Sequence, residues 1–217
     1  ETFLMTSDER KDAYAAAAGA VAEGRQVVVV FPVREGKDLL SSQDALRMAD
    51  ALRVEAFPES AIAIYSSSMS RDDRQRVLDD FQHRRIDVLV STTFIEDTPE
   101  VSNAGIMMVE YADLHTAERL HRLRGYVADA REGGRCFLVQ SDSPDENATE
   151  RLTRLLSERD GLRLAELDLD GEESSRLPAD VSADLPEFRW MNPQTSRGMI
   201  VRAREQAFRV LQSDPEL

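Results

Sequence analysis

The stretch Gln26-Val27-Val28-Val29-Val30-Phe31, followed by Pro32, decides the fold class of this chain. After Gln26 every side chain in the stretch is apolar, and most are β-branched valines, which favours a β-strand. An apolar run without alternation predicts a strand buried on both faces, as in a parallel sheet. We therefore expect this strand to lie inside a sheet that is covered by helices on both sides.

The segments on either side of this strand alternate between helical and strand-like patterns. Gly24 ends the first predicted helix, and Ser42, Ser70 and Thr116 stand where helix N-caps are expected. The predicted helices are about 9–23, 42–54, 70–81, 116–124 and one that starts at Ser143-Pro144, and the further predicted strands are 61–65, 86–90, 105–110 and 135–140. This alternation predicts an α/β fold with a parallel sheet and helices on both faces. Ligands of such sheets bind at the carboxyl ends of the strands.

The composition changes near residue 161. Asp168 to Glu173 is acidic, and Pro178 and Pro186 interrupt the segment after it, before a final helix that Thr195 can cap. We predict a main domain at 1–160 and a small extension at 161–217, loop-rich and helical, anchored by apolar side chains such as Trp190.

Charge and composition limit the classes of partner. The chain has 217 residues, 41% of them hydrophobic and 31% charged, with a net charge of −14, so any contact with a nucleic-acid backbone must be local. It shows neither an apolar run of membrane-spanning length nor a signal peptide. Its one cysteine, Cys136, lies in an apolar run that predicts a buried thiol. We expect a cytoplasmic protein without a membrane partner.

Several familiar catalytic motifs are excluded. Gly36-Lys37 resembles the end of a phosphate-binding loop, but Phe31 stands where that loop needs glycine, and Asp38 replaces its serine or threonine. A dinucleotide-binding glycine motif and a nucleophile elbow are absent. The three histidines, His83, His115 and His121, have no carboxylate at ligand spacing, so no metal site is predicted.

Two polar stretches remain informative. Val90 to Glu96 ends a predicted strand in Ser91, Thr92 and Thr93, whose hydroxyls could hold phosphate or sugar oxygens or simply cap a turn. Arg119 to Gly125 concentrates positive charge on an acidic chain. It could be an anion site or a solvated helix face, and the residues alone leave both alternatives open.

In this order and spacing, these stretches resemble the C-terminal half of RecG-type DNA helicases of superfamily 2. Residues 87–96, Asp-Val-Leu-Val-Ser-Thr-Thr-Phe-Ile-Glu, are similar to the family's D-I-L-V-A-T-T-V-I-E, and 101–104 to its V-P-N-A. Residues 120–127, Leu-His-Arg-Leu-Arg-Gly-Tyr-Val, are similar to L-H-Q-L-R-G-R-V. The resemblance covers nearly the whole chain. It implies a RecA-like lobe, the second of two, with nucleotide contacts at Glu100, Arg122, Arg124 and Gly125 and DNA contacts at Ser67, Ser91, Thr92 and Thr93.

The chain differs from the family at the motif positions that the resemblance places at the ATP cleft. The family's Q-x-x-G-R-x-G-R places two arginines at the ATP cleft, and in related NTPases such an arginine finger contributes about 10³–10⁵ to the rate. Here Arg122 stands at the glutamine, and Tyr126 and Asp129 stand at the arginines. A carboxylate at 129 repels a triphosphate. In the segment 97–100, Pro99 is rigid where the family has a flexible region.

The resulting expectation is a RecG-like helicase lobe, derived from DNA repair and recombination enzymes that act on branched DNA, without an intact catalytic residue. It implies the first helicase lobe of the same parent chain as partner, weak contact with DNA, no cofactor in this chain alone, and ATP with Mg²⁺ only when that first lobe is present. A protein-interaction module that keeps the scaffold and uses its acidic surface is the alternative. A small-molecule enzyme on a Rossmann-like sheet has no supporting motif.

Overall fold

The computed structural model describes residues 1–32, 42–98, 101, 104–127, 133–158, 160–161, 163–164, 202–203, 206 and 209–210, with only the backbone described at 42–46 and 97. The chain divides into two compact units, Glu1–Glu172 and Glu173–Leu217. The predicted acidic stretch, the anchor Trp190 and the helix start at Thr195 lie outside the described residues. The domain boundary at 160 stays a prediction.

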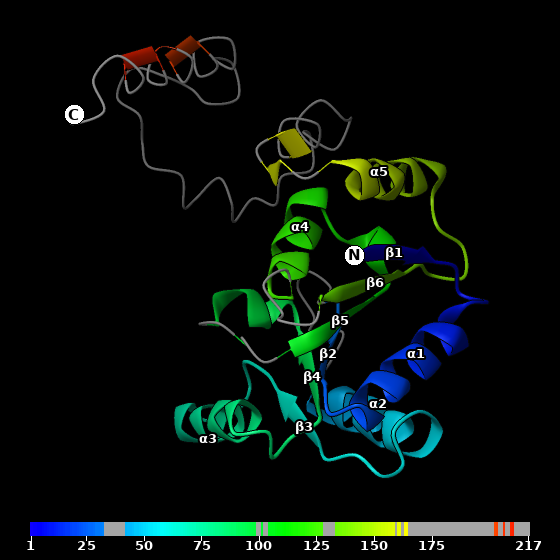
Figure 1. Cartoon of the computed structure of the whole chain (residues 1–217), viewed down its shortest axis with the longest axis vertical. Coiled ribbons are helices and arrows are strands. Elements are labelled where there is room, and N and C mark those ends of the chain that lie inside the picture. Colours follow the sequence, from blue (N-terminus) through cyan, green and yellow to red (C-terminus); the bar gives the residue numbers. More distant parts are fainter. Residues whose placement is uncertain are drawn as a thin grey trace. The chain divides into compact units, whose positions relative to one another are not determined.

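The described residues of the first unit form one six-stranded parallel sheet in the order β1-β6-β5-β2-β4-β3 (Figure 1). The strands are β1 (Thr2–Met5), β2 (Gln26–Phe31), β3 (Ile62–Tyr65), β4 (Val88–Thr92), β5 (Ala104–Glu110) and β6 (Arg135–Val139). The valine run forms β2, between β5 and β4, as the apolar pattern predicts. Every strand runs in the same direction, so all carboxyl ends meet at one edge.

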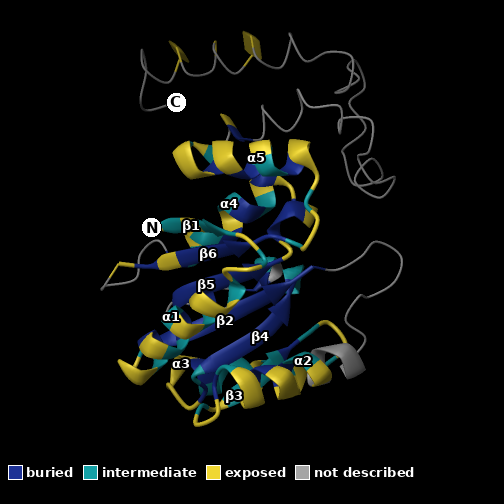
Figure 2. Cartoon of the chain, turned by 90° about the vertical axis from the view of Figure 1, so that its right-hand side faces the viewer, coloured by how far each residue is buried: buried dark blue, intermediate teal, exposed yellow. Residues whose placement is uncertain are grey.

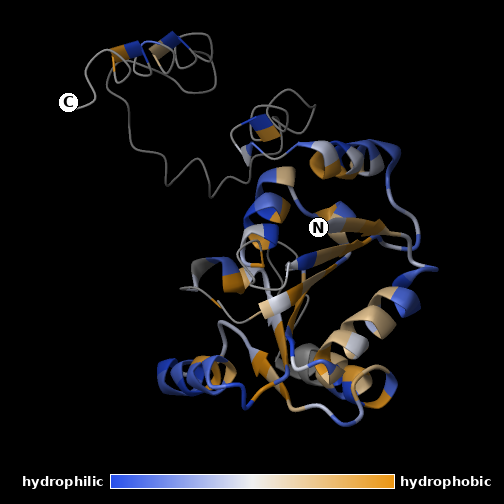
Figure 3. Ribbon diagram, in the orientation of Figure 1, coloured by the Kyte–Doolittle hydropathy of each residue, from blue (hydrophilic) through white to orange (hydrophobic). Residues whose placement is uncertain are grey.

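Helices cover both faces of this sheet. They are α1 (Arg10–Ala22), α2 (Ser42–Glu55), α3 (Arg71–Gln82), α4 (Ala117–Gly125) and α5 (Glu146–Ser157), with the short 3-10 helices η1 (Thr93–Asp97) and η2 (Ala112–Leu114). Val27 and Val29 face a core made with α1 and α2, whereas Val28 and Val30 face a core made with α3, α4 and α5. Figure 2 shows the central strands β2, β4 and β5 buried, the edge strands β1 and β3 mostly half-buried, and the outer faces of the helices exposed. Figure 3 shows that hydrophobic residues are concentrated in the strands. The predicted α/β fold is confirmed.

The first residue of β2 joins the sheet to α3. The side chain of Gln26 is buried, and its Nε2 donates hydrogen bonds to the carbonyls of Phe81, at 2.7 Å, and Ile86, at 2.6 Å. Buried carbonyls that lose such a donor cost about 1–3 kcal/mol. Gln26 therefore fixes the turn between α3 and β4, a role that its position in an apolar run does not reveal.

The predicted helix starts at Ser70 and Thr116 are confirmed, and one at Ser143-Pro144 is wrong. Helix α2 begins at Ser42, but the side chain of that residue lies outside the described residues, so its role as a cap stays a prediction. Ser70 accepts a hydrogen bond from the amide of Asp73, and Thr116 accepts one from the amide of Arg119. Helix α5, however, begins at Glu146 with Asp145 as its N-cap, not at Ser143-Pro144. The carboxylate of Asp145 accepts from the amide of Asn147, so the stronger cap defines the start.

Two strands also differ from expectation. The strand predicted at 86–90 is β4 at Val88–Thr92. Asp87, directly before it, donates its amide to the carbonyl of Ala61, and its carboxylate accepts from the amide of Ala61. Strand β1 was not predicted. It has four residues and pairs with β6 alone, so its existence depends on a neighbour more than 130 residues away.

Candidate functional site

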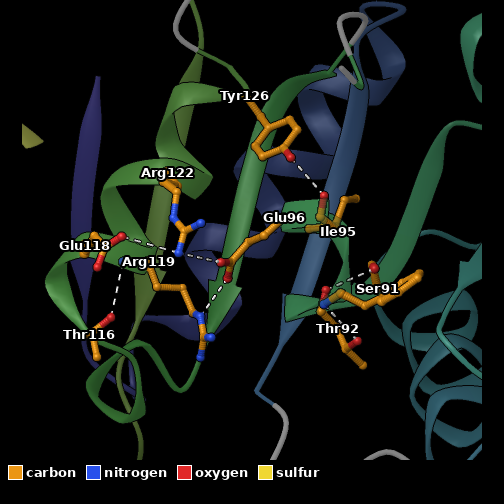
Figure 4. Close-up of polar contacts among 10 residues, drawn as sticks. Ser91, Thr92, Ile95, Glu96, Thr116, Glu118, Arg119, Arg122 and Tyr126 are labelled. Carbon is orange, nitrogen blue, oxygen red and sulfur yellow. Dashed lines mark hydrogen bonds and ion pairs between the residues drawn. The ribbon is translucent and has the colours of Figure 1, made fainter. Parts of the chain in front are cut away.

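The predicted DNA-contact hydroxyls lie at or just after the carboxyl ends of β4 and β3, and Figure 4 shows two of them, Ser91 and Thr92. Ser91 is buried, and its Oγ donates to the carbonyl of Tyr65 at 2.9 Å and lies 3.1 Å from that of Thr92. Thr92 is also buried and accepts from the amide of Phe94 at 3.3 Å. Thr93 is half-buried, and Ser67 is exposed. The turn uses the first two hydroxyls internally, whereas Thr93 and Ser67 are accessible. DNA contact at all four stays a prediction.

A buried carboxylate connects η1 to α4. The side chain of Glu96 is 7% exposed, and it pairs with Arg119 Nε at 2.8 Å and with Arg122 Nη2 at 3.5 Å. Arg122 also lies 3.5 Å from Glu118 on its own helix. The basic stretch is thus neither purely a solvated helix face nor an open anion site. Its two central arginines are half-exposed and held by acidic neighbours.

Tyr126, at one of the two arginine positions, points back into the domain. Its hydroxyl has one proton, which it donates to the carbonyl of Ile95 at 2.9 Å, and it also lies 3.2 Å from the carbonyl of Thr98. The ring packs against the core on the α4 side of the sheet. A phenol hydroxyl is neutral and cannot stabilise phosphoryl charge as a guanidinium does.

Arg124, a predicted nucleotide contact, reaches towards α5. Its guanidinium donates to the carbonyls of Leu155, at 2.8 Å, and Glu158, at 2.6 Å, and lies 2.7 Å from Nδ1 of His121. A cation at these last carbonyls stabilises the end of α5. Gly125, also predicted there, is exposed and ends α4. Nucleotide contact at either residue stays a prediction.

Sequence reasoning missed a polar cluster at the carboxyl end of β5. The carboxylate of Glu110 is 3% exposed and pairs with Arg10 Nε at 3.1 Å. Burial raises the pKa of Glu110, while the charge of Arg10 and a hydrogen bond from Tyr14 act to lower it. Arg10 also lies over the ring of Tyr111. The signal that could have revealed this cluster is a carboxylate at the end of an apolar strand, directly opposite the first turn of a helix.

A second missed group surrounds η2. Asp113 is buried and accepts from both the amide and the hydroxyl of Ser141, each at 2.7 Å. His115 is 3% exposed, and its Nε2 has no hydrogen-bond partner among the described residues. Burial, followed by the positive charge of Arg119, lowers the pKa of His115 to about 4. The ring is therefore neutral at physiological pH.

Some site predictions lie outside what the structure describes. Glu100 and Asp129, and the rigid Pro99, are among those residues. Across the described ranges, no group of three or more His, Cys, Asp or Glu side chains is arranged to hold a metal ion. No helix there is long and apolar enough to span a membrane. Cys136 is buried, and burial raises the pKa of its thiol to about 12, so it is a structural side chain.

Comparison with known proteins agrees with this geometry. The helicase conserved C-terminal domain family matches residues 11–126. The ATP-dependent DNA helicase RecG of Synechocystis sp. is 29% identical over 216 residues, which cover 100% of this chain and 26% of that protein. RecG of Thermotoga maritima is 34% identical over 169 residues, which cover 78% of this chain and 22% of that protein. A solved structure of RecG bound to a three-way DNA junction is 30% identical, with a TM-score of 0.67, over 87% of this chain and 24% of the other. The chain thus spans about a quarter of the length of each of these relatives.

Proposed function

We propose that this chain, which belongs to the helicase conserved C-terminal domain family and is a RecG-type lobe, has lost the arginine side chains that take part in ATP hydrolysis. It would then be a helicase lobe by descent that is inactive in isolation. Its parent would act on branched DNA in repair or recombination, with slow ATP turnover or none. A cytoplasmic location is part of the same proposal.

One observation carries the proposal. The side chain at the first arginine position is a tyrosine whose hydroxyl donates to a carbonyl of its own domain, that of Ile95, and lies 3.2 Å from that of Thr98. The second position is Asp129, and a negative charge there would oppose the charge that develops on a transferring phosphoryl group. Both replacements act in the same direction, and neither side chain can supply a guanidinium.

The proposed partners come from the part of the relatives that this chain does not span. Because the chain spans about a quarter of its relatives, the proposed partner is a first lobe in the same parent chain, which would bring the phosphate loop, ATP and Mg²⁺. Arg122 would be the contact of this lobe with the nucleotide, since its side chain is 55% exposed on α4. Thr93 and Ser67 would be its accessible contacts with a DNA backbone.

The proposal predicts slow ATP hydrolysis by the full-length parent. With branched DNA present, released phosphate measured with malachite green should accumulate about 10³-fold more slowly than with RecG of Thermotoga maritima, since an arginine finger contributes at least that factor. The control is the same assay without DNA. Vigorous turnover that DNA stimulates, at a rate similar to the relative, would contradict the loss of arginine chemistry.

The net charge of −14 favours one alternative, a protein-interaction module without DNA activity. Fluorescence anisotropy of labelled forked DNA separates the two functions. A helicase lobe should bind at low salt and lose affinity as salt rises, because phosphate contacts release counterions. Absence of binding at the lowest salt concentration, where charge-driven binding is strongest, would favour the interaction module.

A further inference from the structure

A chain of hydrogen bonds from three hydroxyl side chains connects the end of α4 to the end of β3. Tyr126, directly after α4, donates to the carbonyl of Ile95 and also lies 3.2 Å from that of Thr98. Thr98 is buried, and its Oγ1 donates to the hydroxyl of Tyr65 at 2.9 Å. The ring of Tyr65 in turn stacks on that of Phe94, with 5.6 Å between centroids. Residues 94–98 are therefore held by contacts from both α4 and β3.

Electrostatic contacts hold the same segment on its α4 side. Glu96, in the middle of η1, pairs with Arg119 and Arg122 (Figure 4). The carbonyl of Ile95 that accepts from Tyr126 also accepts from the amide of Thr98, at 3.0 Å. The tyrosine hydroxyl thus bonds at the point where the short helix closes its own last turn.

We propose that Tyr126 is a positioning residue that fixes residues 93–98 against helix α4. Its neutral hydroxyl is a compact donor that reaches two carbonyls while the ring stays in the core, whereas a guanidinium would need its charge neutralised there. Thr93, the first residue of the segment, and Thr92, directly before it, are then held in one arrangement at the sheet edge. The inference goes beyond the loss of ATP hydrolysis and does not depend on it, because it concerns only contacts within this lobe.

Hydrogen exchange of the 217-residue chain tests this role. Tyr126→Phe keeps the ring and removes only the donor. Amides at 93–98 should then exchange about tenfold faster, as expected for a local opening that has lost one hydrogen bond. Amides of β5, at 104–110, should exchange as in the wild type. Tyr111→Phe is the matched control, because its hydroxyl makes no hydrogen bond to the described residues and its side chain is 36% exposed.

A second variant tests the hydrogen bond at the β3 end of this chain of hydrogen bonds. Thr98→Val removes the bond to Tyr65 with little change in shape, and it should loosen the same segment. The proposal is overturned if Tyr126→Phe changes exchange at 93–98 by less than twofold. It is equally overturned if exchange rises to the same extent in β5, because Tyr126 would then be an ordinary core side chain.

Discussion

The stability of the folded chain should fall by about 2–3 kcal/mol between pH 7.5 and pH 4.5 through His115 alone. Burial and the charge of Arg119, together with that of Arg151, lower the pKa of this imidazole from 6.5 to about 4. The imidazole therefore takes up a proton near pH 6.5 in the unfolded chain, but only near pH 4 in the folded chain. Stability is fully present above pH 6.5 and is lost as the pH falls towards 4, at 1.36 kcal/mol per unit of pKa difference.

Urea unfolding followed by circular dichroism at the two pH values measures this effect. His115→Asn replaces the ring with an amide that does not titrate, so the variant should lose about 2–3 kcal/mol less than the wild type between the two pH values. Any cavity that the smaller side chain leaves costs the same at both values. His83→Asn, which makes the same substitution at an exposed histidine, is the matched control.

The comparison between variant and wild type is needed because Glu110 acts in the opposite direction. Burial raises the pKa of this carboxyl, so the folded chain takes up a proton more readily, and this contribution grows as the pH falls. Asp113 and the backbone of Glu110 also act to raise the pKa of His115. Equal losses in the wild type and in His115→Asn would show that the ring titrates as freely in the folded chain as in the unfolded one.

The parts of the fold that could be predicted from the sequence are those that residues close together in the chain determine. Ser70 and Thr116 cap helices through amides three residues away. The unbroken apolar run of β2 predicts by itself a strand that is buried on both faces. Strand β1 and the sheet order depend on pairing between distant segments, and no local pattern encodes that. The position of Gln26 was predicted, but its hydrogen bonds to Phe81 and Ile86 were not.

In the site, the residue types could be predicted from the sequence, but the directions of the side chains could not. Sequence comparison placed Tyr126 and Arg124 at family positions, but it could not say where the side chains point. The structure turns Tyr126 towards η1 and Arg124 towards the last carbonyls of α5, 31 and 34 residues further along the chain. His115 was weighed only as a metal ligand, because its burial between charged neighbours comes from the packing of η2.

Restoring both arginines should raise DNA-stimulated ATP hydrolysis by the full-length parent about 10²-fold or more. The double variant Tyr126→Arg/Asp129→Arg returns a guanidinium to each family position and removes the repelling carboxylate. An arginine finger contributes about 10³–10⁵ in related NTPases, and part of this gain should be lost because the segment 93–98 no longer receives the hydroxyl of Tyr126. The rate is measured as released phosphate with saturating branched DNA.

The control must match the charge change, since a rise of three in net charge could increase DNA binding by itself. Val54→Arg/Glu59→Arg makes the same change at exposed positions near the end of α2, and it should leave turnover within about twofold. The single variant Tyr126→Arg should gain less than the double variant, because Asp129 would still repel the triphosphate. If the double variant melts like the wild type and hydrolyses ATP no faster than the control, the two replaced arginines are not what limits turnover.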